Sequence, residues 1–366
     1  MSRVSLKRWL LVAVIVGLLL LLVACSPPVA GVAQQVARPA AGVTWLGGAE
    51  WAPHIATLGA DAVHHWNYTK WQADAAGATG LTYYPAVWGC GATGNVWDRV
   101  GAAELAAFAT RYPGRAWLIF NEPELKGQAN CLPEQGAQAY RVIYPAIKLA
   151  DPTSRVFCCG TTTWKWTASF LRAYVELYDE LPKIDGFHFH LYRYGDYDWQ
   201  AATNELDAFR QWQQAVKWNG AGRWGENLPV ILSEWGVLPE AGLGNDPQGI
   251  ADYLRALWPQ LEARPWVETH FWFSNFTTGE YAASNLFNQD GTPTVVGKAW
   301  QEMATGLSPP TPTPTVTSTP TATPTAIPTQ MPTATFTPMP TSTPMLTPWA
   351  YLCRCWPDRC ECDRVP

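Results

Sequence analysis

Charged residues are scarce in this chain, and basic residues are not in excess. Asp, Glu, Lys and Arg make up 15% of the 366 residues, and the formal net charge is −5. Without a basic surplus the chain lacks the long-range attraction to phosphate groups that nucleic-acid binding needs, so we do not expect nucleic acid as a partner. No Walker sequence, the glycine-rich signature of a nucleotide-phosphate loop, follows any apolar run.

Apolar and aromatic residues, in contrast, are abundant. Hydrophobic residues make up 48% of the chain, and 21 residues are Trp. The chain can therefore bury a large core. This Trp content favours an aromatic-lined groove, although a large barrel can also bury Trp between its helices and strands.

The N-terminus has the pattern of an export signal. Basic residues precede an apolar run at residues 9–24, which ends in small residues before Cys25. Residues 22–25 resemble the lipobox of bacterial lipoproteins, so residues 1–25 are predicted to be a lipoprotein signal peptide and Cys25 the lipidation site. Anchoring by more than one acyl chain is stable, which predicts an extracytoplasmic, membrane-anchored protein. An ordinary signal peptide, giving a secreted protein, or an uncleaved anchor is the alternative.

The other cysteines must be interpreted for an oxidising compartment. Cys90 and Cys131 each fall just beyond an expected strand end, where they form either a disulfide between two loops or two free thiols. Cys158 and Cys159 are adjacent in an apolar run and are predicted to be small buried hydrophobes.

Composition divides the chain into five parts. Residues 26–40 form a short tether, residues 41–306 a compact domain, and residues 307–349 a Pro/Thr repeat that cannot pack a core and predicts a semi-rigid spacer. Residues 350–366 form a tail with four Cys in a C-x-C-x4-C-x-C pattern. We favour two disulfides there over a tetrathiolate metal site, and no function follows from the pattern.

Short apolar runs alternate with longer amphipathic ones throughout the compact domain. Eight strands are expected, within residues 42–48, 61–68, 81–88, 116–123, 154–160, 185–192, 229–236 and 268–275. Segments whose apolar residues have helical spacing separate the later strands, for example residues 136–150 and 247–261. This α/β pattern over roughly 265 residues predicts a (β/α)8 TIM barrel, with little room for the first helix; a doubly wound open sheet is the alternative.

Polar residues close four of the expected strands. In a (β/α)8 barrel the active site lies at the C-terminal strand ends. Strand alternation places His188, His190 and Tyr192 on one face, and it places Glu234 on the same face as Val230 and Leu232. Asn121 and Glu122 would point in opposite directions on a regular strand, so both reach the pocket only if the strand twists or bulges before Pro123.

Two carboxylates in an aromatic-rich pocket suit glycoside hydrolysis, because one must protonate the leaving oxygen while the other attacks or activates water. Glu122 and Glu234 are the candidates, about three βα units apart. The H-x-H pair at residues 188 and 190 is interpreted as pocket histidines rather than metal ligands, so we expect neither metal nor cofactor.

Several short motifs resemble those of a known enzyme group. "IFNEPE" and "ILSEWG" look like the acid/base and nucleophile motifs of the large clan of retaining (β/α)8 glycoside hydrolases. Together with "YYPAVWG", "FHFHLY" and "SEWGVL", they resemble the glycosyl-hydrolase catalytic-core family that contains the endo-β-1,3-glucanases of glycoside hydrolase family 128. The resemblance covers essentially the whole compact domain.

The resemblance implies roles for individual residues. Glu122 matches the general acid/base and Glu234 the nucleophile; Asn121 would bond the sugar hydroxyl beside the reacting carbon, Tyr192 would lie near the nucleophile, and Trp272 would form a sugar-stacking floor. Around them, His188 and His190 are expected to contact sugar or nucleophile, and Trp66 and Trp88 either line sugar subsites or pack under loops.

Together with this resemblance, which implies a retaining mechanism and β-1,3-glucan as the substrate, the sequence predicts a monomeric, lipid-anchored hydrolase of a β-linked polysaccharide. Two alternatives stay open. A member of the same clan could act on xylan, mannan or another β-glucan, or the barrel could be a non-catalytic carbohydrate-binding surface lipoprotein.

Overall fold

The computed structural model describes residues 38–91, 100–216, 225, 227–239, 246–306, 351–356 and 359–364. The predicted signal peptide with Cys25, the tether up to residue 37 and the Pro/Thr spacer lie outside the described residues. Within them, none of the helices has both the length and the apolar content required of a membrane span.

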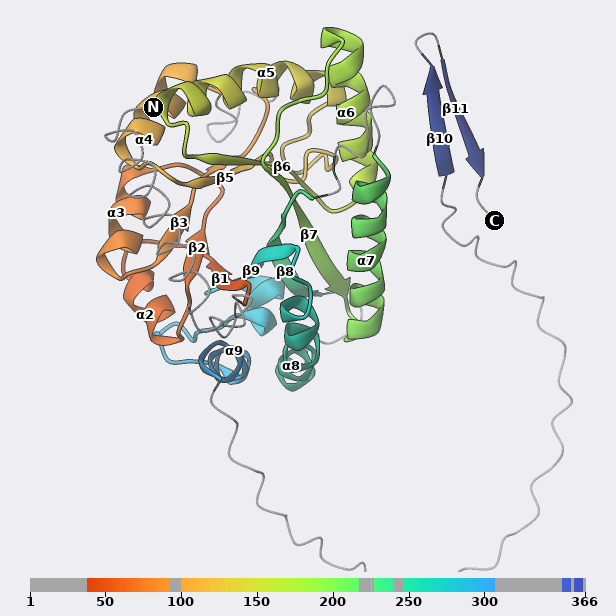
Figure 1. Cartoon of the computed structure of the whole chain (residues 1–366). Helices are drawn as coiled ribbons and strands as arrows, with labels where there is room; N and C mark the ends of the chain where they lie inside the picture. Colours follow the sequence, from red (N-terminus) through yellow and green to blue (C-terminus); the bar gives the residue numbers. More distant parts are fainter. Residues whose placement is uncertain are drawn as a thin grey trace, which may run out of the picture. The chain divides into compact units, whose positions relative to one another are not determined.

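The strands form a closed barrel (Figure 1). They are β1 (Ala40–Thr44), β2 (Ala62–His64), β3 (Thr82–Tyr84), β4 (Ala86–Val87), β5 (Ala116–Ile119), β6 (Arg155–Thr161), β7 (Gly186–Tyr194), β8 (Val230–Leu238) and β9 (Val267–Trp272). All pairs are parallel, and the order is β3-β2-β1-β9-β8-β7-β6-β5-β4.

The two ends of that order, β3 and β4, are consecutive in the chain. Between them lies Pro85, which has no backbone N–H to give to a ladder. β3 pairs with β2 and β4 pairs with β5, so the two short strands are one barrel strand interrupted at Pro85. The barrel therefore has eight strand positions, which confirms the predicted (β/α)8 fold.

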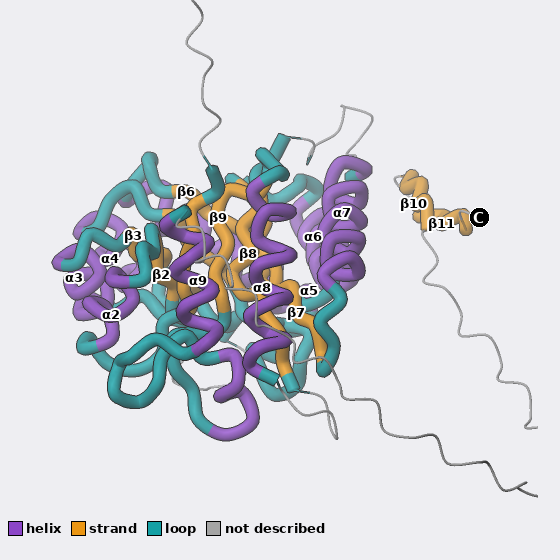
Figure 2. Tube along the Cα trace, turned by 90° about the horizontal axis from the view of Figure 1, so that it is seen from below, coloured by secondary structure: helices purple, strands orange, loops and turns teal. Residues whose placement is uncertain are grey.

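Helices surround the barrel as an outer ring (Figures 1 and 2). They are α2 (Trp51–Thr57), α3 (Lys70–Ala78), α4 (Ala102–Arg111), α5 (Pro133–Ala150), α6 (Trp164–Tyr178), α7 (Trp199–Ala215), α8 (Pro247–Glu262) and α9 (Val295–Thr305), with a 3-10 turn, η1, at Gly279–Ser284. Side-chain caps fix several starts: Asp246 accepts from the backbone of Gln248 and Gly249 before α8. The first helix, α2, has only seven residues, as its short segment predicts.

The doubly wound alternative is excluded by the strand order, because a closed ring of sequential neighbours has no topological switch point. Residues 89–94, which follow β4, do have G-x-G-x-x-G spacing. In this topology that spacing does not mark a dinucleotide site, since the motif acts at the first turn of an open sheet.

The apolar core has two parts. The smaller cluster comes only from strands and fills the barrel interior: Ala62, Tyr84, Ala86, Ala116, Leu118, Phe157, Ile231 and Phe271. The larger cluster joins the outward strand faces to the helices. Six Trp are fully buried, namely Trp45, Trp117, Trp235, Trp258, Trp272 and Trp300. Much of the high Trp content is therefore packing material, as the alternative interpretation of that content allowed.

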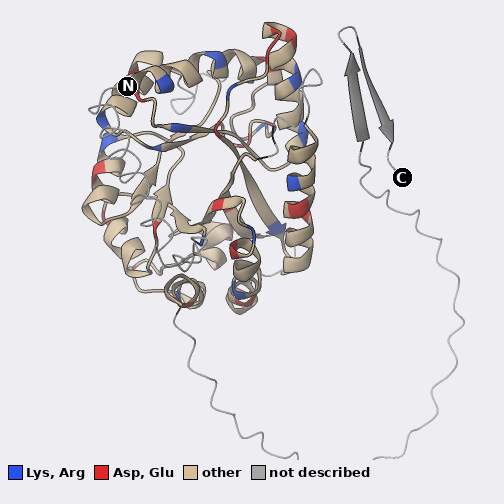
Figure 3. Cartoon of the chain, viewed as in Figure 1, with Lys and Arg blue, Asp and Glu red and all other residues tan. Residues whose placement is uncertain are grey.

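Charged residues are interspersed around the helical ring (Figure 3). Ion pairs link neighbouring elements: Arg264 contacts Asp207 at 2.7 Å, and Arg255 contacts Glu302 at 2.9 Å. Such partly exposed pairs contribute little stability individually.

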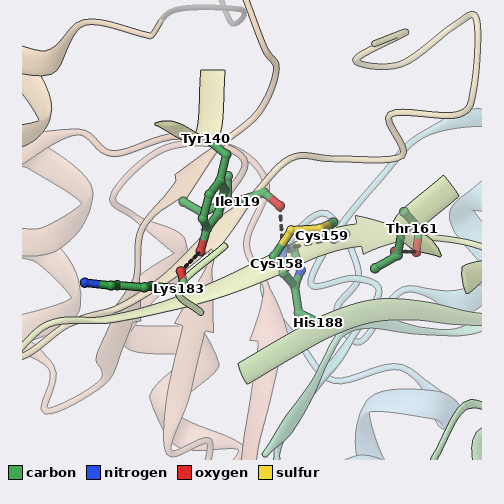
Figure 4. The surroundings of a disulfide bond; sticks show 9 residues. Ile119, Tyr140, Cys158, Cys159, Thr161, Lys183 and His188 are labelled. Atoms are coloured by element: carbon green, nitrogen blue, oxygen red, sulfur yellow. Dashed lines mark hydrogen bonds between the residues drawn. A yellow bond between two sulfur atoms is a disulfide. The ribbon is translucent and has the colours of Figure 1, made fainter. Parts of the chain in front are cut away.

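Four cysteines of the barrel are paired. Cys90 and Cys131 form a disulfide, which is the first of the two alternatives. Cys158 and Cys159 are fully buried on β6, as predicted, but they are bonded to each other rather than acting as simple small hydrophobes (Figure 4). His188 and Ile119 lie beside this pair in the same view.

The tail belongs to a second unit of the chain, residues 312–366. It contains an antiparallel hairpin of β10 (Tyr351–Trp356) and β11 (Arg359–Arg364). The register places Cys353 opposite Cys362 and Cys355 opposite Cys360.

Candidate active site

Glu122 lies at the end of β5, the fourth barrel strand, in an irregular turn. Phe120 and Glu122 both have left-handed backbone, with φ of 70° and 44°. Asn121 and Glu122 are nevertheless both buried, with 6% and 8% exposure. The break from regular alternation that the sequence required before Pro123 is therefore present. Left-handed conformations are unfavourable for residues other than glycine, and they collect at functional sites.

Glu234 reaches the same place by a different irregularity, and the alternation argument for it is wrong. Val230 and Leu232 belong to the helix-facing cluster, whereas Ile231 faces the barrel interior. On a regular strand Glu234 would therefore point outward. The register against β7 moves from Phe189–Leu232 to His190–Glu234, which leaves Ser233 as an extra residue. This bulge redirects Glu234 inward.

The two glutamates meet around His190. His190 Nδ1 lies 2.9 Å from Glu122 Oε1 and 3.6 Å from Glu234 Oε2. One carboxylate oxygen of each glutamate and a His190 ring nitrogen all lie within 4.8 Å of one another, and all three residues are buried. The predicted inward face of β7 is confirmed, because His190 and Tyr192 both contact these carboxylates.

The hydrogen bonds of the two carboxylates differ. Glu234 accepts from donors on both oxygens: Trp66 Nε1 donates to Oε1 at 2.6 Å, and the Tyr192 hydroxyl donates to Oε2. Both donors favour the ionised carboxylate. Glu122 contacts His190 Nδ1, which can accept a proton from a carboxylic acid as readily as donate one. Glu234 therefore has two fixed donors in addition to the histidine that it shares with Glu122.

Burial and charge act against each other in this cluster. Burial raises the pKa of Glu234, as does the neighbouring Glu122, while His190, Tyr192 and Trp66 lower it; the pKa remains above that of an ordinary glutamate. Burial lowers the pKa of His190, but Glu234 and Glu122 outweigh burial and raise it. A perturbed group in contact with a carboxylate pair is typical of acid–base chemistry.

The same three side chains, Glu122, His190 and Glu234, also have the types and spacing of metal ligands. However, each already has a protein partner at a contacting atom, and Trp66 and Tyr192 occupy both oxygens of Glu234. A metal there would have to displace these donors, so the residues fit acid–base chemistry better.

The other pocket histidine, His188, has a supporting role. Its Nδ1 bonds Ser233 Oγ at 2.8 Å, and its Nε2 lies 2.9 Å from the Ile119 carbonyl and 3.0 Å from the Gly160 amide. Burial lowers the pKa of His188 to about 3, so the ring is neutral. His188 thus joins the bulged residue of β8 to the strand ends beside Glu122.

Three predicted sugar contacts have different surroundings. Asn121 lies beside Glu122, and its Nδ2 donates to Gln128 Oε1 at 3.2 Å. Trp88 is half-buried and packs on the helix-side cluster, which agrees with the packing alternative. Trp272 does not fit the predicted stacking floor, because it is 0% exposed. Its ring packs edge-on against Trp235, and its N–H donates to the Ser284 carbonyl, on the outward face of β9.

Phe273 occupies the place expected of Trp272. It follows Phe271, an interior residue, by two positions, so alternation turns it toward the pocket. Its ring lies 6.2 Å from Trp66 and 5.9 Å from Tyr192, the two donors to Glu234. The family resemblance implied this role for Trp272, whereas the two-residue alternation that starts at Phe271 indicates Phe273.

Comparison with known protein families identifies the family of the barrel. The profile of the family described as "Glycosyl hydrolase catalytic core" matches residues 42–300, which is most of the chain. The fold and the buried carboxylate pair define a barrel of the glycoside hydrolase type, and the chain belongs to this glycosyl hydrolase catalytic-core family.

Solved structures share the fold at low sequence identity. An endo-β-1,3-glucanase of glycoside hydrolase family 128, subgroup I, from Amycolatopsis mediterranei, solved with laminarihexaose, is 21% identical with a TM-score of 0.55; the match covers 72% of this chain and 98% of that one. A subgroup II endo-β-1,3-glucanase from Pseudomonas viridiflava is 21% identical, with a TM-score of 0.56 and coverage of 73% and 97%.

A subgroup VI exo-β-1,3-glucanase from Aureobasidium namibiae matches as well, at 15% identity and a TM-score of 0.52, with coverage of 72% and 96%. Comparison with functionally curated proteins finds no match.

Proposed function

We propose that this protein is a retaining endo-β-1,3-glucanase in which Glu122 is the general acid/base and Glu234 the nucleophile. The observation that carries the proposal is the close approach of the two buried carboxylates, whose nearest ligand atoms lie within 4.8 Å. Retaining glycosidases hold their carboxyl groups about 5–5.5 Å apart, whereas inverting enzymes need about 6.5–9.5 Å to fit a water.

In the first step, Glu234 attacks the anomeric carbon while Glu122 protonates the glycosidic oxygen that leaves. Hydrogen bonds from Trp66 and Tyr192 favour the ionised form of the attacking carboxylate and fix its direction. His190 lies between the two glutamates, and its Nδ1 is closer to Glu122 than to Glu234. The product of this step is a covalent glycosyl-enzyme.

In the second step, Glu122, now ionised, removes a proton from a water that attacks the same carbon and releases Glu234. Two displacements on one carbon restore the original anomeric configuration. The hydrolysed sugar is therefore expected to keep the β configuration.

The substrate assignment is supported by the family 128 enzymes that share the fold, among them one solved with laminarihexaose and one with laminaritriose. Endo action is proposed because the first of these structures are endo-acting enzymes. The fold alone is compatible with exo action, as the exo-β-1,3-glucanase from Aureobasidium namibiae illustrates.

A polysaccharide panel tests the proposal. The purified protein is incubated with β-1,3-glucan, mixed-linkage glucan, xylan, mannan and cellulose beside a Glu234→Gln control. We expect oligosaccharides from β-1,3-glucan with the wild type and none with the control. Products from another polymer alone would make that polymer the substrate in place of β-1,3-glucan. Binding of polysaccharide without any new reducing ends would make the barrel a non-catalytic surface lectin.

We also propose that the enzyme is displayed outside the cytoplasm through lipid on Cys25. The apolar run at residues 9–24 and the lipobox-like end support this. Labelled fatty acid should appear on the protein in cells and be absent from a Cys25→Ser variant. Label on that variant, or none on the wild type, would remove the lipid anchor and leave an ordinary exported enzyme.

A further inference from the structure

Glu124, two residues after the proposed acid, ties its loop to the next βα unit. Its Oε1 accepts three hydrogen bonds, from Thr162 N at 2.6 Å, Thr162 Oγ1 at 2.8 Å and Thr163 N at 3.1 Å. Thr163 is the N-cap of α6, and the free N–H groups and positive end of a helix favour a carboxylate. The side chain thus joins the segments that follow β5 and β6 through three hydrogen bonds.

A second contact joins the same two segments through Glu122 itself. The Glu122 amide donates to the Gly160 carbonyl at 2.6 Å while its own backbone is left-handed, with φ of 44°. The left-handed region is unfavourable for a residue other than glycine, and the conformation persists only when its surroundings hold it. Glu124 supplies a strong hold two residues away.

Part of the Glu124 carboxylate is buried, so its hydrogen bonds are not simple surface contacts. Its second oxygen, Oε2, is buried and has no hydrogen-bond partner among the described residues. Placing a carboxylate there is unfavourable unless the other oxygen is well bonded, which the three donors achieve. The charge also reaches the pocket: after burial, Glu234 and Glu122, it is among the influences on the pKa of His190.

The far end of the loop is held by other means. Cys131 is bonded to Cys90, and its carbonyl accepts from Trp166 Nε1 at 2.8 Å. Loss of the Glu124 link would therefore release the end of the loop that carries Glu122 and leave the other end in place.

From these contacts we propose that Glu124 is a positioning residue: by binding the start of α6, it fixes the Glu122 carboxyl where it can protonate the leaving oxygen. The inference rests on the proposed function. It concerns the acid step, so the loss of activity on removing Glu124 should depend on the leaving group. General damage to the fold or to substrate binding would lower activity on all substrates alike.

The test compares leaving groups. Protonation by a general acid contributes about 100- to 10,000-fold for poor leaving groups and little for ones that depart as stable anions. We expect Glu124→Ala to lower kcat/KM about 10- to 100-fold on β-1,3-glucan and on aryl glycosides with weakly acidic phenols. On the 2,4-dinitrophenyl β-laminaribioside its activity should stay within about threefold of the wild type.

Glu124→Gln is the rescue variant, because its amide oxygen can still accept from the two threonines; we expect it to recover most of the activity. Glu134→Ala, a change of an exposed glutamate in the first turn of α5, is the matched control and should behave as the wild type. If Glu124→Ala does not fold, Thr162→Val carries the test, since it removes only the hydroxyl donor and should show the same selectivity at smaller size.

Equal losses on both classes of substrate, or no loss on either, would overturn the inference while leaving the proposed function intact. A wild-type protein with no activity on any of these glycosides would instead overturn the proposed function.

Discussion

Two neutral groups donate hydrogen bonds to Glu234, and the direction in which their removal shifts the pKa of Glu234 can be predicted. The Tyr192 hydroxyl and Trp66 N–H stabilise its ionised form, against burial, which raises its pKa. In Tyr192→Phe the pKa of Glu234 should rise further, because a hydrogen bond that favours its ionised form is lost. The acid limb of the kcat/KM profile should then move to higher pH.

The control for that change is Tyr194→Phe, the next tyrosine of β7, which is half exposed and does not donate to Glu234. Its pH profile should match the wild type. An acid limb unmoved in Tyr192→Phe would mean that Glu234 does not control it.

His270 predicts a pH dependence of stability that is separate from activity. It is 0% exposed between Trp235 and Trp258, and burial lowers its pKa to about 3. Below the unfolded pKa near 6.5, the unfolded chain binds a proton that the folded chain excludes, so stability falls as pH falls toward 3. Between pH 7 and pH 5 this residue alone removes about 2 kcal/mol from the free energy of unfolding.

The variant His270→Leu tests this by comparison of its acid loss of stability with that of the wild type. Guanidinium unfolding at pH 7 and pH 5 should show a smaller acid loss in the variant than in the wild type, by about 2 kcal/mol. Identical losses in the two proteins would show that His270 titrates normally or that its protonated form is accommodated.

Residue types alone could identify both glutamates but not how each reaches the pocket. Pro123 signalled an irregular end to β5, whereas nothing in "VILSEWG" marks Ser233 as a bulge. Bulges are set by the pairing of two strands, which a single strand sequence does not contain. The stacking role that the resemblance implied for Trp272 is wrong, because the two-residue period that Phe271 establishes turns Trp272 outward.

At the scale of elements, the loop after β5 is fixed by the Cys90–Cys131 disulfide, which closes a sequence separation of 41 residues. In the chain-entropy model, closing a loop of this length lowers the entropy of the unfolded chain and so raises the free energy of unfolding by about 4 kcal/mol. The double variant Cys90→Ser, Cys131→Ser should lose stability of that order in guanidinium unfolding and keep its fold under mild conditions, since Trp166 still binds the Cys131 carbonyl.

A matched pair of substitutions in the other unit, Cys353→Ser with Cys362→Ser, should leave barrel unfolding unchanged. Equal stability of the Cys90, Cys131 variant and the wild type would contradict the assigned contribution of the disulfide.

The tail hairpin predicts its own cysteine connectivity. Directly opposite strand residues lie about 4.5–5.5 Å apart, within the range of a disulfide, whereas neighbours along a strand are farther apart. We therefore expect Cys353–Cys362 and Cys355–Cys360. Mass spectrometry of the unreduced tail should find a mass four hydrogens below the reduced form. Four free thiols holding one zinc ion would contradict this and favour the tetrathiolate alternative.

At the scale of the molecule, the strand count and the barrel closure could be predicted from the sequence. Each βα unit contains an apolar strand run followed by a segment whose apolar residues have helical spacing. The interruption of one strand at Pro85 was not predicted, and the contacts between distant segments, such as Trp66 with Glu234 or Glu124 with Thr162, depend on closure itself. A barrel brings eight strand ends together, so its site is assembled from pairs that no local pattern contains.

The covalent intermediate on Glu234 tests the central claim most directly. A 2-deoxy-2-fluoro β-laminaribiosyl fluoride slows both steps and, through its good leaving group, lets the glycosyl-enzyme accumulate. Mass spectrometry of the intact protein and of its peptides should find one added 2-fluoro-disaccharide, located on Glu234, and none on the Glu234→Gln variant. Rapid turnover of β-1,3-glucan with no such adduct, or an adduct on another residue, would contradict the double-displacement account.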